Sequence, residues 1–426
     1  MTLVIFLGVL LVAILIGIPV AFALLLSSLA IMLQLGMLNP EIVSLSLING
    51  VDSFTLLAIP FFLIAGEVMS VGGLSKRIVA LFMSLVGHRN GGLGYVAIAT
   101  SVVLASLSGS AVADAAALVS ILYPMMRDAG YPRGQSLGLL ASGGLIAPII
   151  PPSLPLIIVG VTGNLSIGDL FVGGIVPGLL MAAALIVTWS IIIRKKKLVV
   201  IERVPWRGRL SALKGSLWAL LMPVIIIGGI RTGVVTPTES AVVAAVYAIV
   251  VSKFIYRELT WTQLVQVLVN AGRTTAMVML MVGASMVAAW LITVAQLPQQ
   301  LGSMFGPLIE HPKWLMLVIM IIVFLVGTVM DLVPTTLVML PLLLPVVKLA
   351  GIDPVYFALM FTINNVIGLI TPPVGSVVNV VAGVGRASMS EVVRGCNPFL
   401  AAYLLLMGLF ILFPEIITAP LHFFRG

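Results

Sequence analysis

Thr371-Pro372-Pro373-Val374-Gly375 stands inside the apolar run 361–384, and this stretch decides how the chain can fold. A proline inside a membrane segment leaves backbone carbonyl groups without partners, and hydrocarbon offers none. Such a break is tolerated only where protein buries it or where it lines a wet cavity. The stretch therefore predicts a discontinuous membrane helix.

A second copy of this break, Ile150-Pro151-Pro152-Ser153, occurs 221 residues earlier, with Pro151 matching Pro372. The same offset aligns Pro124 with Pro345, Ala129-Gly130 with Ala350-Gly351, Gly174 with Gly395 and Pro177 with Pro398. The matches run from residue 124 to residue 177 without a gap, which indicates a duplicated unit. Broken helices at corresponding positions of two halves are typical of the binding sites of secondary transporters.

The composition is that of a polytopic membrane protein. Of the 426 residues, 61% are hydrophobic and 8% are charged, whereas a soluble domain has roughly 25% charged residues. The single cysteine, Cys396, excludes internal disulfides and CxxC sites. The net charge of +8 comes from basic residues at the ends of apolar segments. That pattern predicts membrane topology and argues against nucleic acid as a partner.

Basic residues predict the orientation of the segments. The run Arg194–Lys197 is expected to be cytoplasmic by the positive-inside rule. Segment 93–128 is basic at both ends, so it should enter and leave on the cytoplasmic side and turn at Ser106–Ser110. Counting crossings onward places both ends of segment 314–349 outside. The two repeats are therefore expected to be inverted relative to each other.

The resulting fold class is an all-α polytopic membrane protein with two re-entrant hairpins and two discontinuous helices. The apolar run 3–33 is predicted to be one retained membrane helix, because it is far longer than the core of a signal peptide. The number of crossings before residue 93 stays open, because residues 74–87 are short for a crossing and carry Lys76 and Arg77.

Small and hydroxylated residues mark the first hairpin tip, Ser106-Leu107-Ser108-Gly109-Ser110, with Asp114 after it. Free carbonyl groups and hydroxyls are hard oxygen ligands that suit Na⁺. Close packing of helices through small residues is the alternative interpretation.

The second hairpin contains Gly327-Thr328-Val329-Met330-Asp331, followed by Thr335. A carboxylate within a membrane segment usually faces a wet cavity or a partner. Asp331 is therefore predicted to contact substrate or ion, with capping of the next helix as the alternative.

The two broken helices offer complementary chemistry. Half-helix N-termini present N–H donors to a carboxylate substrate, and half-helix C-termini present carbonyls to a cation. Asn364-Asn365 precede the second break.

Thr236 and Glu239 have capping-box spacing and predict a helix start. Glu41, Asp52 and Glu67 are interpreted as helix-end or interfacial charges.

The sequence does not support an enzyme. His88, His311 and His422 all lie in or beside connections, so no buried Ser/His dyad or histidine metal site is expected. HExxH and P-loop motifs are absent from the sequence, which excludes an ATP-driven pump for this chain alone.

Four motifs together resemble the large membrane subunit (DctM-like) of TRAP transporters. They are Asp52-Ser-Phe-Thr-Leu-Leu-Ala-Ile-Pro-Phe-Phe-Leu-Ile-Ala-Gly-Glu67, Ser108-Gly-Ser-Ala-Val-Ala-Asp114, Gly233-Val-Val-Thr-Pro-Thr-Glu-Ser-Ala-Val-Val-Ala-Ala-Val-Tyr247 and Ile370-Thr-Pro-Pro-Val-Gly375. The resemblance covers essentially the whole chain, and the motif sequences are similar to those of sialic-acid members.

The resemblance implies a Na⁺-driven importer in the bacterial inner membrane. Its expected partners are a small four-helix membrane subunit and a periplasmic substrate-binding protein that delivers a carboxylate. Members of the family transport their substrate by an elevator mechanism, in which a transport domain moves against a fixed scaffold. Residues 93–163 and 314–385 would form the moving domain, and 1–92, 164–313 and 386–426 the scaffold.

The resemblance also implies site residues. The first Na⁺ site would use Ser106, Ser108, Gly109, Ser110 and Pro151, and the second Gly327, Thr328, Thr371, Pro372 and Gly375. Asp331, Thr335, Ser153 and Asn365 would contact the substrate.

Two alternatives stay open. One is a self-sufficient Na⁺/dicarboxylate symporter of the same architecture. The other is a channel or membrane scaffold, which the paired broken helices disfavour because a pore needs no alternating access.

Overall fold

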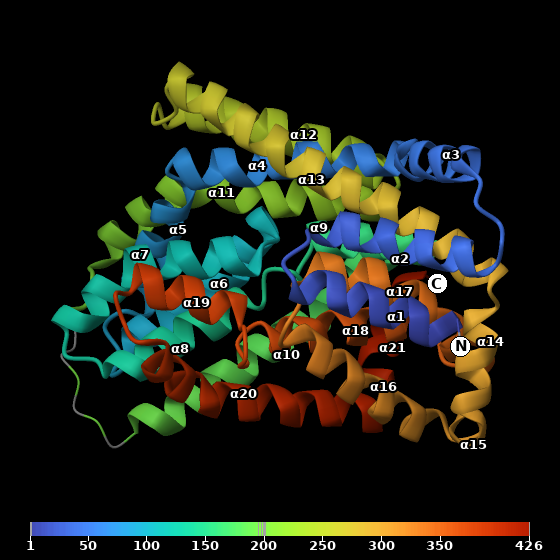
Figure 1. Ribbon diagram of the computed structural model, residues 1–426. Helices are drawn as coiled ribbons and strands as arrows, with labels where there is room; N and C mark the ends of the chain where they lie inside the picture. Colours follow the sequence, from blue (N-terminus) through green and yellow to red (C-terminus); the bar gives the residue numbers. More distant parts are fainter. Residues whose placement is uncertain (1, 195, 197, 199–201, 426) are drawn as a thin grey trace.

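A computed structural model describes residues 2–425 except 195, 197 and 199–201, so part of the predicted cytoplasmic run Arg194–Lys197 lies outside the described residues. Every secondary-structure element in the described part is a helix, as the fold class predicted (Figure 1).

Five consecutive helices of the first half recur in the second half. Helices α6 (Gly92–Ser108), α7 (Ala111–Asp128), α8 (Arg133–Gly144), α9 (Leu154–Gly163) and α10 (Ile167–Ile193) correspond to α16 (Pro312–Gly327), α17 (Leu332–Leu349), α18 (Pro354–Gly368), α19 (Ser376–Val384) and α20 (Met389–Leu412). Applying the 221-residue offset reproduces most of these boundaries to within a few residues. The helix boundaries therefore agree with the predicted duplication.

Both predicted turns lie where the sequence placed them. Helix α6 ends at Ser108, Gly109 has φ +64°, and Ser110 caps α7. A positive φ strongly favours glycine, so Gly109 permits the sharp reversal. In the second half, α16 ends at Gly327 and Asp331 caps α17.

Both predicted helix breaks are also present. The chain leaves α8 at Gly144 and becomes helical again only at Leu154. Likewise, α18 ends at Gly368 and α19 begins at Ser376. The Pro-Pro bond in each break is a cis peptide.

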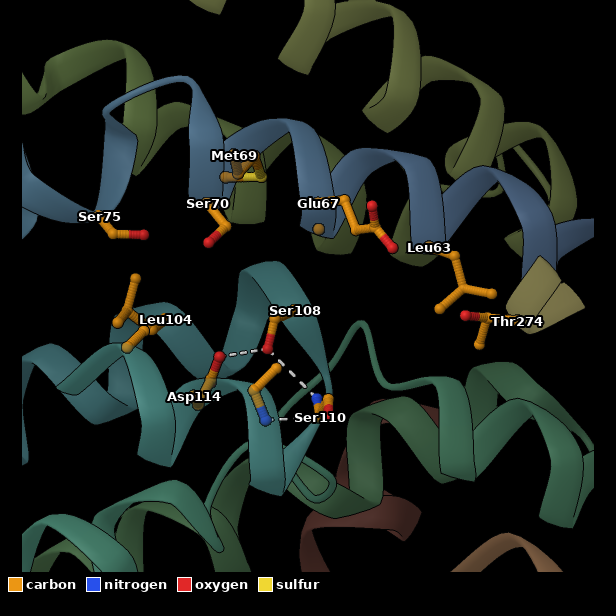
Figure 2. A pocket seen from close by; sticks show the side chains of 13 residues that line it. Leu63, Glu67, Met69, Ser70, Ser75, Leu104, Ser108, Ser110, Asp114 and Thr274 are labelled. Carbon is orange, nitrogen blue, oxygen red and sulfur yellow. Dashed lines mark hydrogen bonds between the residues drawn. The ribbon is translucent and has the colours of Figure 1, made fainter. Parts of the chain in front are cut away.

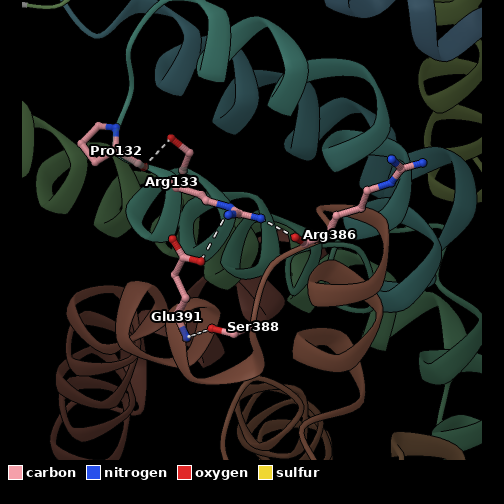
Figure 3. Close-up of polar contacts among 6 residues, drawn as sticks. Pro132, Arg133, Arg386, Ser388 and Glu391 are labelled. Atoms are coloured by element: carbon pink, nitrogen blue, oxygen red, sulfur yellow. Dashed lines mark hydrogen bonds and ion pairs between the residues drawn. The ribbon is translucent and has the colours of Figure 1, made fainter.

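The open end of the first hairpin lies with the start of α8 at one end of the molecule (Figure 1). There, Trp189 Nε1 of α10 donates a hydrogen bond of 3.0 Å to the Gly91 carbonyl, just before α6. Figure 3 shows Arg133, at the start of α8, donating to the Arg386 carbonyl and lying 3.6 Å from the Glu391 carboxylate. This end therefore gathers the start of α8 and the α19–α20 connection.

The open end of the second hairpin lies at the opposite end of the molecule (Figure 1). Lys313 Nζ, at the start of α16, donates a hydrogen bond of 2.9 Å to the carbonyl of Leu412 at the end of α20. The hydroxyl of Tyr356, near the start of α18, donates to the Phe410 carbonyl at 2.9 Å. The two hairpins thus open toward opposite ends of the molecule.

The N-terminal prediction of one helix over residues 3–33 is wrong. The structure has two helices, α1 (Thr2–Leu15) and α2 (Val20–Gln34), which lie side by side (Figure 1). Gly17, with φ +88°, and Pro19, just before α2, let the chain reverse between them. Both helices share an apolar cluster with α13 and α17.

The remaining helices connect these units. They are α3 (Pro40–Val51), η1 (Phe54–Leu57), α4 (Ala58–Val71), α5 (Leu74–Val86), α11 (Trp206–Arg231), α12 (Pro237–Val250), η2 (Val251–Ile255), α13 (Trp261–Val294), α14 (Leu297–Met304), α15 (Gly306–Ile309) and α21 (Glu415–Arg425). Helix α13 starts at Trp261, whereas the apolar run that predicts it, 274–297, begins later in the sequence. Thr236 and Glu239 form the predicted capping box at the start of α12.

Within the described residues, seven helical stretches are long and apolar enough to cross a membrane. They are 54–71, 167–193, 206–231, 237–255, 261–294, 332–349 and 389–412.

Helix α20 packs closely on α8, since a Cβ atom at Gly138 would lie only 2.2 Å from the Gly395 carbonyl carbon.

Candidate functional site

The first hairpin tip lies directly against the first helix break. A Cβ atom at Gly109 would lie 3.0 Å from the Leu154 nitrogen and 3.4 Å from the Pro152 carbonyl oxygen. Only a residue without a side chain allows this approach together with the positive φ of Gly109. Residues 109 and 151–154, far apart in sequence, therefore form one junction.

The hydroxyl groups of this tip already have local partners. Ser106 Oγ donates to the Val103 carbonyl at 2.7 Å. Ser108 Oγ accepts from the Ser110 N–H at 3.2 Å and donates to Asp114 Oδ1. Ser110 Oγ accepts from the N–H of Ala113 at 3.3 Å. Each hydroxyl oxygen keeps a free lone pair, so these contacts are compatible with a cation ligand role.

Ser153 begins the second half of the first broken helix. Its hydroxyl donates to the Pro148 carbonyl at 2.6 Å and accepts from the Leu156 N–H at 3.4 Å. The residue is fully buried. Ser153 therefore holds the break together across Pro151-Pro152.

The second hairpin tip makes an equivalent junction with the second break. A Cβ atom at Gly368 would lie 2.5 Å from the Gly327 carbonyl carbon. The Thr328 carbonyl accepts from the N–H groups of Val374 and Gly375 at 3.1 and 3.4 Å. Backbone hydrogen bonds thus join this tip to the unwound segment.

The polar groups of the unwound segment also contact nearby residues of the same segment. The Thr371 hydroxyl donates to the Ile367 carbonyl at 3.1 Å. Gly375 has φ +52°, and a Cβ atom there would lie 3.2 Å from the Thr371 carbonyl oxygen. Thr371, Pro372 and Gly375 therefore belong to one tight loop that contacts Thr328.

Asn365 lies at this second junction with an unused side chain. A Cβ atom at Gly327 would lie 3.5 Å from the Asn365 amide carbon. Asn365 is fully buried, and neither its Oδ1 nor its Nδ2 has a partner among the described residues. Unpaired buried amides are costly, so this side chain is a strong candidate for a ligand contact.

Asp331 and Thr335 lie at the start of α17. Asp331 Oδ1 accepts from the Leu332 N–H at 2.8 Å, so the carboxylate caps the helix. Thr335 Oγ1 donates to the Asp331 carbonyl at 2.8 Å. The capping role weighed for Asp331 is present, and its exposed carboxylate remains free to accept further contacts.

A cavity of about 310 Å³ lies between α4, α13 and the first hairpin (Figure 2). Glu67 and Asp114 both line it. Asp114 Oδ2 is buried without a hydrogen-bond partner among the described residues. The hydroxyls of Ser70 and Thr274 also line the cavity and face the hairpin from the opposite side.

The structure adds a role to Glu67, which the sequence interpreted as a helix-end or interfacial charge. Glu67 lies inside α4 and lines the cavity, because α4 packs against the hairpin at this level. Asp114 was noted but not assigned a role. An acidic residue inside an apolar run is the signal that identifies both positions.

The oxygen atoms at both junctions are ligands of the kind that a hard cation prefers. Hydroxyl and carbonyl oxygens predominate, and oxygen ligands suit alkali and alkaline-earth cations better than transition metals. Among the described residues, no group of three His, Cys, Asp or Glu side chains forms a metal cluster. These oxygen atoms are ligands of the kind that Na⁺ binds.

The helices, hairpins and breaks together define an all-helical, multi-pass membrane protein with an internal duplication. Residues 7–416 match the family described as tripartite ATP-independent periplasmic transporter, DctM component. The chain belongs to this family, and it is a transporter permease subunit rather than an enzyme.

Curated relatives extend over almost the whole chain. The 2,3-diketo-L-gulonate TRAP transporter large permease of Escherichia coli is 50% identical and covers 99% of both chains. The sialic acid TRAP transporter large permease of Vibrio cholerae is 38% identical and covers 96% of both chains.

A solved structure supports the fold independently. The YdaH transporter of Alcanivorax borkumensis matches with a TM-score of 0.61 at 13% identity, over 87% of this chain and 88% of that chain. At this identity the likeness concerns the fold alone.

Proposed function

We propose that this subunit imports an organic acid together with Na⁺ by an elevator motion. The observation that carries the proposal is the pair of junctions in which each hairpin tip lies against its own helix break. Two such junctions, with the hairpins opening toward opposite ends, provide equivalent ion sites for outward- and inward-facing states.

The first proposed Na⁺ site uses the tip Ser106–Ser110 and the carbonyls of the break at Pro151. The second uses Gly327, Thr328 and the loop Thr371–Gly375. Binding of Na⁺ to Thr328 or Thr371 would compete with the backbone contacts described above. An ion held by oxygens of both the tip and the loop would replace these contacts and hold the junction closed, which couples the ion to the motion of the tip.

The proposed substrate is a carboxylate that carries hydroxyl groups, with sialic acid as one candidate. Helix N-termini at α9 and α19 offer N–H donors to a carboxylate. The carboxylates of Glu67 and Asp114 in the neighbouring cavity can accept hydrogen bonds from hydroxyl groups. The names of the relatives that are 50% and 38% identical, a diketogulonate and a sialic acid permease, agree with this class.

The moving unit is proposed to consist of residues 93–163 and 314–385, with the rest of the chain as scaffold. The backbone contact between Gly138 and Gly395 is too close for sliding. It favours adding α20 to the moving unit, and the pseudo-symmetry favours adding α10.

The proposed assembly is a bacterial inner-membrane complex with a small four-helix membrane subunit and a periplasmic substrate-binding protein. Family membership in a tripartite periplasmic system supports both partners. The alternative is a self-sufficient Na⁺/dicarboxylate symporter.

The test is substrate uptake into proteoliposomes that contain this chain and the small subunit. Uptake that needs both an inward Na⁺ gradient and the binding protein supports the proposal. Gradient-driven uptake without the binding protein supports the self-sufficient symporter. A conductance that is independent of the gradient indicates a channel and contradicts both.

A further inference from the structure

A second cavity, an open crevice of about 650 Å³, lies between α5, α6 and α10, away from both junctions. Its walls are mainly apolar and include Phe82, Val86, Ile98, Val102, Leu179 and Ile186. Leu179 and Ile186 are exposed large hydrophobic side chains of α10. Such a surface requires an apolar occupant.

The crevice has the length of one leaflet of a bilayer. On α10 it extends from Leu179 to Ser190, which is about 16 Å along a helix that rises about 1.5 Å per residue. Half of a hydrocarbon core of about 30 Å is about 15 Å. The Tyr95 hydroxyl and Ser190 Oγ bond to each other at 2.8 Å, so the wall between them carries no unpaired hydroxyl.

The crevice is open to its surroundings rather than enclosed, so a narrow hydrocarbon chain can lie in it.

One end of the crevice is positively charged. Arg89 lines it there, is exposed, and forms no ion pair among the described residues. Partial desolvation, followed by the charges of Arg209, Arg203 and Arg89, lowers the pKa of the neighbouring His88. The positive charges therefore lie close together without matching acids.

None of the acids in the described part of the chain forms an ion pair with Arg89. Asp128 lies 3.0 Å from Arg127, and Glu391 lies 3.6 Å from Arg133. Glu202 is exposed on the connecting loop and forms no ion pair within the described part of the chain. Arg89 thus remains available for an external anion.

We propose that this crevice binds one anionic phospholipid, with its acyl chains along α6 and α10 and its phosphate on Arg89. The length matches one leaflet, the walls match hydrocarbon, and the charge matches an anionic head group at the cytoplasmic surface. This site does not depend on the transport mechanism proposed above.

The test compares lipid retention by native mass spectrometry after purification in detergent with phosphatidylglycerol or phosphatidylcholine. The wild-type protein should retain phosphatidylglycerol in preference. Arg89→Gln should weaken retention about fivefold, since a basic residue near an anionic surface contributes about this factor. The matched control is Arg127→Gln, which removes one charge from the same end but from an arginine paired with Asp128.

Crevice-filling variants test the acyl-chain part of the site. Ala99→Trp and Ala183→Trp place bulk on opposite walls, and either one that folds should lose the retained lipid. Equal retention of the two lipids, equal weakening by Arg89→Gln and Arg127→Gln, or full retention in a folded Trp variant would overturn the proposal. Loss of the lipid when the small subunit co-purifies would instead identify that subunit as the occupant and also overturn it.

Discussion

Gly368→Ala is the most direct perturbation of the second junction. Gly368 is the last residue of α18, and a Cβ atom there would lie 2.5 Å from the Gly327 carbonyl carbon and 2.7 Å from its oxygen. Ordinary contacts begin at 3.4 Å, so the hairpin tip must move by roughly 1 Å. The aligned residue of the first half is Ala147, so alanine itself suits this part of a broken helix.

The expected cost follows from overpacking. Forcing a methyl group into a packed interface costs about 1–3 kcal/mol. If Na⁺ binding must supply this energy by closing the junction, the apparent Na⁺ affinity falls about 5- to 150-fold. The Gly327 carbonyl is the first group to be displaced, and the neighbouring Thr328 carbonyl, which accepts from Val374 and Gly375, moves with it.

The assay is the Na⁺ dependence of uptake, combined with the Na⁺-dependent rise in melting temperature of the purified protein. Gly383→Ala is the matched control, since it lies on α19 of the same broken helix and has nothing within 4 Å of the added Cβ atom. A Gly368→Ala protein with the Na⁺ dependence of wild type would falsify the proposed role of the second junction.

Four further substitutions each change a single polar residue. Ser108→Ala and Asp331→Ala should each abolish uptake while the protein still inserts into the membrane, and wild-type uptake by either variant removes that residue from the site. Asp114→Asn keeps the side-chain shape but removes the buried charge beside Ser108. The apparent Na⁺ affinity should therefore fall at least about tenfold, which is about 1.4 kcal/mol. An unchanged Na⁺ titration would exclude Asp114 from the first Na⁺ site. Thr236→Ala removes the capping box of α12 and should lower the free energy of unfolding by about 0.5–2 kcal/mol, seen as a lower melting temperature, and a changed Na⁺ dependence would contradict its purely structural role.

The duplicated core could be predicted from the sequence because local signals repeat there. Proline breaks and glycine turns are encoded within a few residues, and the constant offset confirms each against its copy. Gly109 and the breaks at 151–152 and 372–373 were therefore placed correctly.

The N-terminal helices were harder to predict because apolar content alone does not show a reversal. Gly17 and Pro19 are local turn signals, but they sit in a continuous apolar run that also suits one long helix. In α13 the apolar run begins later than the helix, since polar residues such as Arg273 precede that run. Burial of these residues depends on helices distant in sequence.

The cavity beside the first hairpin could not be predicted as a whole. Glu67 and Asp114 belong to α4 and α7, and only tertiary packing brings them to one cavity. The same holds for the junctions, where the sequence predicted the tip and the break but not the contact between Gly327 and Gly368.

Cysteine labelling can show whether the two re-entrant hairpins open to opposite sides of the membrane. Asn90 and Asp128 bracket the first hairpin, His311 and Leu349 bracket the second at the same 221-residue offset, and all four are exposed. The native Cys396 is buried and serves as the unreactive background. A membrane-impermeant maleimide should reach cysteines at 90 and 128 only from the cytoplasmic side and cysteines at 311 and 349 only from the periplasmic side. Labelling of all four positions from one side, or of the two ends of either hairpin from different sides, would contradict the account.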